Sequence, residues 1–293
     1  MFKASVVSLA LVLLSHTVPA QTPSFDPAPI EKATGMKGTY IAAENVYKIS
    51  KPRSNMAAID GWKLPPFLGT SSYAAFMPTG NKQAMVIADN VLFEDEVGPA
   101  MSAALENGLE VTGLHNYFFF DRPKLYFMHI GGMGETEALA TAVKKVLDAP
   151  DRIRSGQASP ATGYPAKPAS RESHITAGLL EGIFGKKGKI NNGMFKVSYG
   201  RPVKMHGTTA GDAMGGNTWA GFAGTDNQAV VDGDFAMLEG ELQPVLKSLR
   251  GAGINVVAIH NHMAHEEPRL VFLHYWGKAR PRIWPRQSVR LWA

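Results

Sequence analysis

The sequence contains no cysteine in its 293 residues. This absence excludes disulfide bonds, thiolate metal ligands, a cysteine nucleophile and a lipid-modified N-terminal cysteine. Any metal site in the chain must therefore be built from histidine nitrogens, carboxylates or backbone oxygens.

Long apolar runs and long basic runs are also missing. Beyond the N-terminus, no stretch approaches the roughly 18–20 apolar residues of a membrane-spanning helix, so no span is predicted in the mature chain. The net charge of +5 is scattered, with no long Lys/Arg run and no interleaving of basic with aromatic residues. We therefore predict no nucleic-acid partner and interpret the charge as a mild bias toward an anionic cell envelope.

The first twenty residues have the organisation of a signal peptide. Lys3 precedes an apolar run over residues 4–14 that only serines interrupt, and small residues precede the expected cleavage site near Ala20/Gln21. This pattern predicts a periplasmic or secreted mature chain. The alternative is a buried N-terminal helix.

The rest of the chain contains one unit twice. Gln83–Gly132 aligns without a gap over Gln228–Gly277, at a constant offset of 145 and with 16 identities in 50 positions. Upstream, Val46–Arg53 resembles Met194–Arg201. Internal repeats of this kind determine the domain organisation. We divide the chain into a signal peptide (1–20), a first repeat unit (21–149), a linker rich in Pro, Ser and Ala (150–172) and a second repeat unit (173–293).

Each unit is predicted to be an α+β domain. Behind extra leading strands comes a strand, and then a helix within residues 94–108 and 239–253, with acidic residues before its start, proline in its first turn and glycine after its end. Two strands and, in the first unit, an amphipathic helix over 135–149 follow. This β-α-β-β-α order predicts two tandem ferredoxin-like units, with helices on one face of an antiparallel sheet. The strand order stays open, as does the alternative that the leading strands form a separate small sheet.

The second unit departs from the first at its end. Pro281 and Pro285 interrupt the segment that matches the closing helix of the first unit. Because proline breaks helices, this helix is predicted to be degenerate or missing. Natural trimming and a reading-frame error would each produce such a tail.

A cluster of histidines marks the second unit. His260, His262, His265 and His274 are four of the nine histidines in the chain. Alternation along a strand places His260 and His262 on one face with Val256 and Ala258, and a tight turn would set His260 roughly opposite His274. Three imidazoles that converge in this way resemble a His₃ zinc site.

The predicted metal ligands are therefore His260, His262 and His274, with His265 or Glu267 as the candidate catalytic or accessory group. Zinc is the first choice of metal, with copper or nickel as alternatives. In the first unit only His115 and His129 are retained, and Tyr117 replaces His262. The competing interpretation is structural: the shared histidines are buried polar groups that lock the hairpin by hydrogen bonding.

Other polar residues suggest weaker sites. Asp234 and Glu239 lie near one strand-to-helix junction and could form an acid/base pair or a cation site, although acidic residues also favour a helix N-terminus. Arg53 and Arg201 follow equivalent strands and are candidates for anion or ligand binding. For both arginines, the alternative is a solvated or inter-strand ion pair.

The repeated segment resembles the LppY/LpqO family of bacterial envelope proteins, a domain of unknown function that occurs in tandem. The resemblance is carried by "VDGDFAMLEGELQPVLKSLRGAGINVVAIHNHMAHEEPRLVFLHYWG", "LLEGIFGKKGKI" and "MFKVSYGRP". It extends over nearly the whole mature chain, once per unit, and implies a cell-envelope location. The first unit departs from the family pattern at Tyr117, Ile130 and Gly131. The family implies no settled activity.

Three functional hypotheses follow. The first is an exported envelope protein whose second unit binds a divalent metal or uses it for hydrolysis. The second is a metal-free module in which a cleft between the units binds peptidoglycan or another cell-wall polymer. The third is a structural, partner-binding protein. A small-molecule ligand and any oligomeric state are left open by the sequence.

Overall fold

The computed structural model describes residues 26–53, 58–59, 62–163, 172–279 and 281. The predicted signal peptide lies outside these residues, as does most of the C-terminal tail in which the closing helix is predicted to degenerate. Among the described residues, none of the helices has both the length and the apolar character needed to cross a membrane.

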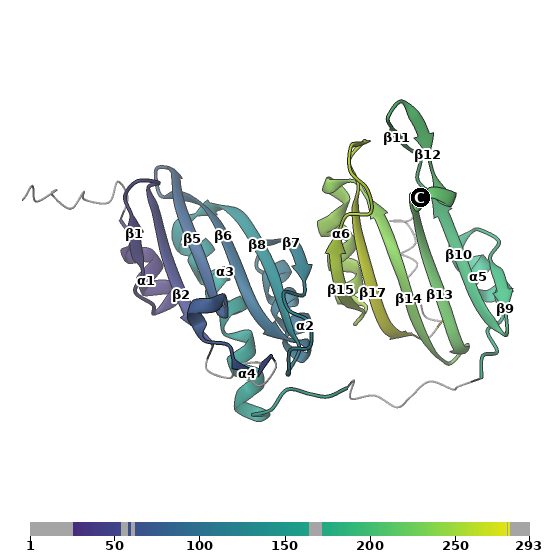
Figure 1. The fold of residues 1–293 in the computed structure, drawn as a ribbon, viewed down its shortest axis with the longest axis horizontal. Coiled ribbons are helices and arrows are strands. Elements are labelled where there is room, and N and C mark those ends of the chain that lie inside the picture. The colour runs from purple at the N-terminus through teal and green to yellow at the C-terminus, as the bar shows by residue number, and fades with distance from the viewer. Residues whose placement is uncertain (1–25, 54–57, 60–61, 164–171, 280, 282–293) are drawn as a thin grey trace, which may run out of the picture.

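Twelve antiparallel strands form one continuous sheet (Figure 1). The strands of the first unit, in spatial order, are β1 (Thr39–Ile41), β2 (Val46–Pro52), β5 (Ser71–Gly80), β6 (Gln83–Phe93), β8 (Leu125–Glu135) and β7 (Glu110–His115). The second unit continues from β15 (Asn255–His260) through β17 (Val271–Ala279), β14 (Gln228–Met237), β13 (Asn217–Thr225) and β10 (Met194–Gly200) to β9 (Lys189–Asn191).

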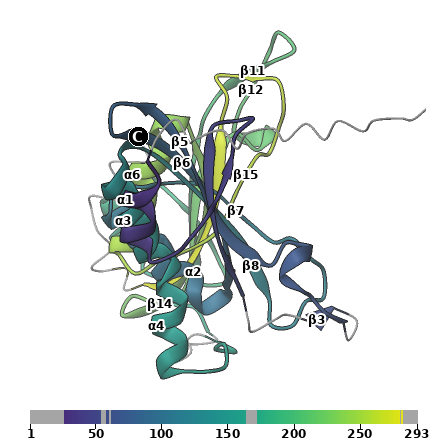
Figure 2. The ribbon, with the colours of Figure 1, turned by 90° about the vertical axis from the view of Figure 1, so that its left-hand side faces the viewer.

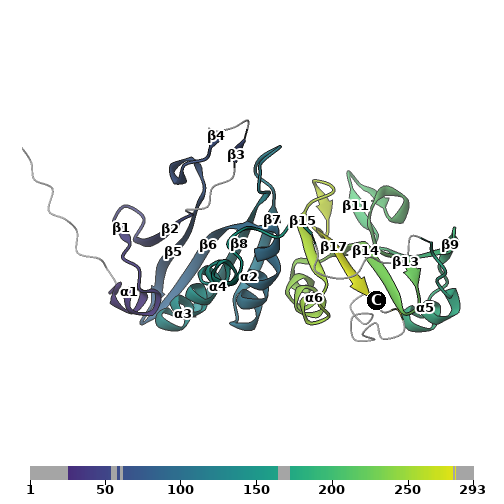
Figure 3. The same cartoon turned by 90° about the horizontal axis from the view of Figure 1, so that it is seen from below.

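The helices lie together on one face of this sheet, as Figures 2 and 3 show. They are α1 (Ala28–Thr34), α2 (Glu94–Glu106), α3 (Thr136–Leu147), α4 (Ala149–Gly156), α5 (Ala177–Phe184) and α6 (Glu239–Gly251). Small elements rise from the opposite face: β3 (Ala58–Ile59), β4 (Trp62–Lys63), η1 (Pro66–Leu68), β11 (Val203–Met205), β12 (Thr208–Ala210), η2 (Asp212–Met214) and β16 (Glu266–Glu267). The predicted α+β organisation is confirmed.

Within each unit the central strands have the order expected of a ferredoxin-like split β-α-β. In the first unit β8 lies between β6 and β7, and α2 connects the two outer strands of this trio. β17 has the same place between β14 and β15, with α6 as the connection. The predicted leading strands belong to the main sheet, because β5 and β13 pair directly with β6 and β14, whereas the short strands β3–β4 and β12–β11–β16 form two small separate sheets.

The helices α2 and α6 begin in the same way because their sequences carry the same polar residues. The Glu96 carboxylate accepts a hydrogen bond from the backbone N–H of Phe93 (2.8 Å), and Glu241 accepts one from Leu238 (2.7 Å). Each glutamate thereby satisfies a backbone donor that the helix leaves unpaired. After each helix, a glycine with positive φ turns the chain into the next strand.

The two units join edge to edge. Leu114 in β7 pairs with Ile259 in β15, and these residues are equivalent at the offset of 145. One hydrophobic core runs beneath both halves of the sheet, with Leu114 and Met101 from the first unit and Leu246 and Leu273 from the second. The junction is therefore an approximate twofold arrangement of two copies of the same surface. Helix α4 occupies the start of the segment predicted to be a linker.

Candidate metal centre

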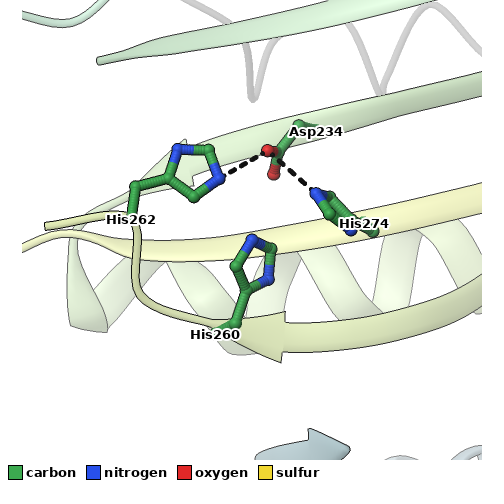
Figure 4. A group of neighbouring side chains, drawn as sticks. All are labelled: Asp234, His260, His262 and His274. Carbon is green, nitrogen blue, oxygen red and sulfur yellow. Dashed lines mark ion pairs between the residues drawn. The ribbon is translucent and has the colours of Figure 1, made fainter. Parts of the chain in front are cut away.

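Four side chains converge on the open face of the second unit, away from the helices (Figure 4). Asp234 on β14 lies directly across from His274 on β17. His260 ends the neighbouring strand β15, and His262 follows two residues later. Three adjacent strands thus contribute to one point, because β17 lies between β14 and β15.

The distances fit a single small cation. Asp234 Oδ2 is 3.0 Å from His262 Nε2 and 3.3 Å from His274 Nε2. One ligand atom from each of Asp234, His260, His262 and His274 lies within 4.8 Å of every other. Ligand atoms around a tetrahedral zinc ion are separated by about 3.3–3.4 Å, given metal–ligand bonds of about 2.0–2.1 Å. A small contraction of the group would therefore place all four around one ion.

The carboxylate of this group is buried, whereas two of its imidazoles reach solvent. The Asp234 side chain is 4% exposed, against 30% for His262 and 50% for His274. Its second oxygen, Oδ1, accepts a hydrogen bond from the backbone N–H of Leu273 (3.2 Å). A buried carboxylate requires positive charge or hydrogen-bond donors nearby, and a cation bound beside Asp234 would supply that charge.

His262 is held by contacts at both of its ring nitrogens. Nδ1 lies 3.3 Å from the carbonyl oxygen of Gly215, while Nε2 faces the Asp234 carboxylate. A neutral imidazole has one N–H and can donate to one of these acceptors only. The second acceptor is satisfied when His262 is protonated or when a cation lies between Nε2 and Asp234. Donation of Nδ1–H to a carbonyl is the usual way in which a metal-binding histidine is oriented.

Ring packing also positions the histidines. His262 stacks on Phe272, with ring centroids 3.7 Å apart and an interplanar angle of 14°, and His260 lies 4.2 Å from His274. Phe272 is fully buried in a cluster with Leu270 and Ala236, among others. The His262 ring, which lies in the loop after β15, is thus positioned by packing on a buried apolar side chain.

His260 is the least solvated of the three imidazoles. Burial lowers the pKa of His260, the neighbouring His274 and His262 lower it further, and Asp234 opposes them. Its Nδ1 is buried and has no hydrogen-bond partner among the described residues. The lowered pKa favours the neutral ring, which is the form that binds a metal.

The strand register differs from the predicted one. His260 lies opposite Phe272, and His274 lies opposite Ala258. A β-bulge at Val257 shifts the pairing, so Val256 belongs to the helix-covered core instead of the face that carries His260. The three histidines still converge, because His274 is diagonal to His260 and the chain after β15 brings His262 back over Phe272.

The candidate accessory residues lie apart from the four-residue group. The His265 ring packs 6.1 Å from His206, and Glu267 on β16 pairs with Lys204 on β11. Neither residue belongs to the converging set. Their catalytic role stays a prediction.

The two arginines are engaged by the carboxylates that begin the helices. Arg53 Nη2 donates to Glu96 Oε1 (2.7 Å), and Arg201 Nη2 donates to Glu241 Oε1 (2.7 Å). Each guanidinium also donates to a strand carbonyl, that of Val91 or Ala236. The arginines therefore fasten a leading segment to the helix start, and their anion-binding role stays a prediction.

The first unit carries an incomplete version of the site. His115 Nε2 lies 2.8 Å from His129 Nε2, and His129 Nδ1 lies 3.6 Å from Asp89 Oδ1. Tyr117 packs on Phe127 (5.0 Å) as His262 packs on Phe272. A phenol thus stands where the second unit has the imidazole of His262. Burial raises the pKa of Asp89, against the lowering effect of His129 and His115.

Asp234 is the member of the four-residue group that the sequence interpretation assigned to a different site. It was paired with Glu239, which lies exposed at the start of α6. The signal for its true partner was available in the repeat: Asp89 and Asp234 match, as do His129 and His274, and both pairs lie directly opposite each other across strands. Only the strand order, which the sequence left open, makes these residues neighbours.

Comparisons with known proteins identify the family. A family model described as Domain of Unknown Function (DUF1259) matches residues 28–149 and 179–287. The chain belongs to this family. Each matched segment of this DUF1259 protein corresponds to one repeat unit, which confirms a tandem domain of unknown function. No curated protein matches the chain. EtuB from Clostridium kluyveri, a solved structure, is 9% identical over 87% of this chain and 89% of its own, with a TM-score of 0.24, too low to support an argument.

Proposed function

We propose that the second unit of this DUF1259 protein binds one divalent metal ion through Asp234, His260, His262 and His274. The observation that carries the proposal is the convergence of three imidazoles on a buried carboxylate. His262 strengthens it, because a cation at Nε2 resolves the competition between its two acceptors.

The donor set favours zinc. Three imidazole nitrogens and one carboxylate oxygen suit a borderline ion in tetrahedral geometry. Copper and nickel also accept imidazole ligands and are the alternatives. Calcium and magnesium require more oxygen ligands than this group provides.

The site supports metal binding in preference to metal-assisted hydrolysis. Four protein ligands complete a tetrahedral shell, whereas catalytic zinc sites keep one position for water. Exposure of His262 and His274 gives an ion a direct path to solvent. An exchangeable ion of this kind suits storage, sensing or delivery of the metal.

Export to the cell envelope is part of the same proposal. It rests on the signal-peptide pattern of residues 1–20 and on the resemblance to LppY/LpqO proteins. N-terminal sequencing of the protein recovered from bacterial periplasm tests it, with Gln21 expected as the first residue. Recovery from the cytoplasm with the N-terminus intact contradicts export.

Elemental analysis of protein purified without a histidine tag tests the metal site. After exposure to zinc and desalting, we expect about one equivalent of bound metal, with a rise in melting temperature. The paired substitution His260→Ala/His274→Ala removes it, whereas the matched first-unit pair His115→Ala/His129→Ala retains it. Binding below about a tenth of an equivalent by the folded wild-type protein, with no thermal shift, rejects the proposal.

A further inference from the structure

The junction between the units departs from its twofold arrangement at one place. On one side, the Gln243 side chain of α6 contacts the edge strand β7 of the other unit. The Val111 N–H donates to Gln243 Oε1 (3.0 Å), and Gln243 Nε2 donates to the Val111 carbonyl (2.9 Å). A side-chain carboxamide thus satisfies the two backbone groups that β7 directs away from its own sheet neighbour.

On the opposite side of the junction, Val256 has the same strand register as Val111, but no side chain equivalent to that of Gln243 faces it. Val111 lies opposite Ile130, and its equivalent Val256 lies opposite Tyr275, so the registers are identical at the offset of 145. The N–H and carbonyl of Val256 therefore point away from β17, toward helix α2 of the first unit. The residue of α2 equivalent to Gln243 is Gly98, which has no side chain. Within the described part of the chain, no side chain hydrogen-bonds to either group of Val256.

A cavity occupies this place. Its volume is about 470 Å³, and its lining includes Gly98, Val256, Asn255, Tyr126 and Ile153. Arg250 lies beside Gly98 at α2: its Nη1 donates to the Ile254 carbonyl (2.9 Å), and its Nη2 lies 2.9 Å from the place that a Cβ at Gly98 would occupy. The volume lies in the range of small-molecule sites.

We infer that this cavity binds a small molecule carrying a primary carboxamide. The ligand would accept a hydrogen bond from Val256 N–H and donate one to the Val256 carbonyl, as the Gln243 side chain does for Val111. A primary amide has N–H and C=O on the same side and makes both bonds at once. Glu94 also lines the cavity and disfavours a carboxylate ligand, whereas the charge of Asp95 is balanced by its ion pair with Arg154.

Benzamide is a suitable probe, because it combines a primary carboxamide with an apolar ring. Titrated into the ¹⁵N-labelled full chain, it is expected to shift the Val256 amide resonance in a saturable way. Benzoate lacks the donor, and N-methylbenzamide directs its single N–H away from its carbonyl, so both are expected to bind at least roughly tenfold more weakly. Equal binding of the three compounds, or an unperturbed Val256 resonance, overturns the inference.

Two variants locate the site. Gly98→Gln combined with Arg250→Leu gives the second side the residues of the first and is expected to abolish benzamide binding. Ile153→Trp narrows the cavity from α4 and is expected to weaken binding should the double variant fail to fold. Retention of wild-type affinity by either folded variant overturns the inference. The His260→Ala/His274→Ala variant is expected to bind benzamide normally, since the cavity does not depend on the metal site.

Discussion

At the scale of single residues, the proposed metal site is distinguished by Asp234. The three histidines are partly solvated, but the aspartate is buried and has only one backbone donor for its two oxygens. Its carboxylate is the one anionic ligand type of the proposed site, because imidazoles bind a metal as neutral ligands. Asp89 is the equivalent residue in the first unit, where Tyr117 replaces His262, and it therefore serves as a comparison for Asp234.

Asp234→Asn is expected to lower zinc affinity by about 100-fold or more, since it removes both a ligand charge and a ligand atom. The change preserves side-chain volume, so folding should be retained. Competition with a chromophoric chelator measures the affinity. The matched control Asp89→Asn is expected to leave it unchanged, and a loss of affinity below threefold in the Asp234 variant would remove Asp234 from the ligand set.

Tyr117→His is expected to create a second metal site. Tyr117 already packs on Phe127 beside Asp89, His115 and His129, so a histidine there would supply the missing ligand. Metal content should rise from about one to about two equivalents per chain. Tyr117→Phe serves as the control. An unchanged content in the folded histidine variant would show that the first-unit backbone does not support the ligand geometry.

At the scale of elements, the two units fill one equivalent position between their central strands with different pairs of side chains. In the second unit Gly233 faces Tyr275 across β14 and β17, and in the first unit Ala88 faces Ile130 across β6 and β8. The Tyr275 hydroxyl donates to the Trp219 carbonyl (3.0 Å) over the glycine. A Cβ at Gly233 would lie 2.2 Å from both oxygens. The glycine is required by the buried tyrosine together with the Trp219 carbonyl to which it donates.

Gly233→Ala is therefore expected to destabilise the protein by roughly 1–3 kcal/mol through overpacking. Tyr275→Ile alone also destabilises, because it leaves a cavity and removes a hydrogen bond. Together they reproduce the first-unit pair, and the double variant should be more stable than the sum of the single losses by about 0.5–3 kcal/mol. Urea unfolding with a chelator present measures each term. Additive losses would contradict the coupling.

At the scale of the whole molecule, the sequence predicts the fold of each unit better than it predicts how the two units pair. The alignment of Gln83–Gly132 with Gln228–Gly277 establishes two α+β units, and the helices α2 and α6 lie within the predicted segments. The bulge at Val257 and the pairing of Leu114 with Ile259 were not predicted. Both depend on contacts between strands distant in sequence, which local patterns do not encode. The histidine cluster was found because its members are close in sequence, whereas Asp234 required the strand order.

The joined sheet also predicts how the molecule unfolds. The shared core and the Gln243–Val111 hydrogen bonds couple the units, so calorimetry is expected to give one cooperative transition. Zinc at about 100 times its dissociation constant should raise that whole transition, by about 2.7 kcal/mol of stability. Gln243→Ala leaves two buried backbone groups without their side-chain partner and should weaken the coupling, so that zinc raises only the part of the transition belonging to the second unit. Two transitions in the wild-type protein, with only one raised by zinc, would instead mean that each unit folds independently and that the edge-to-edge contact adds little stability.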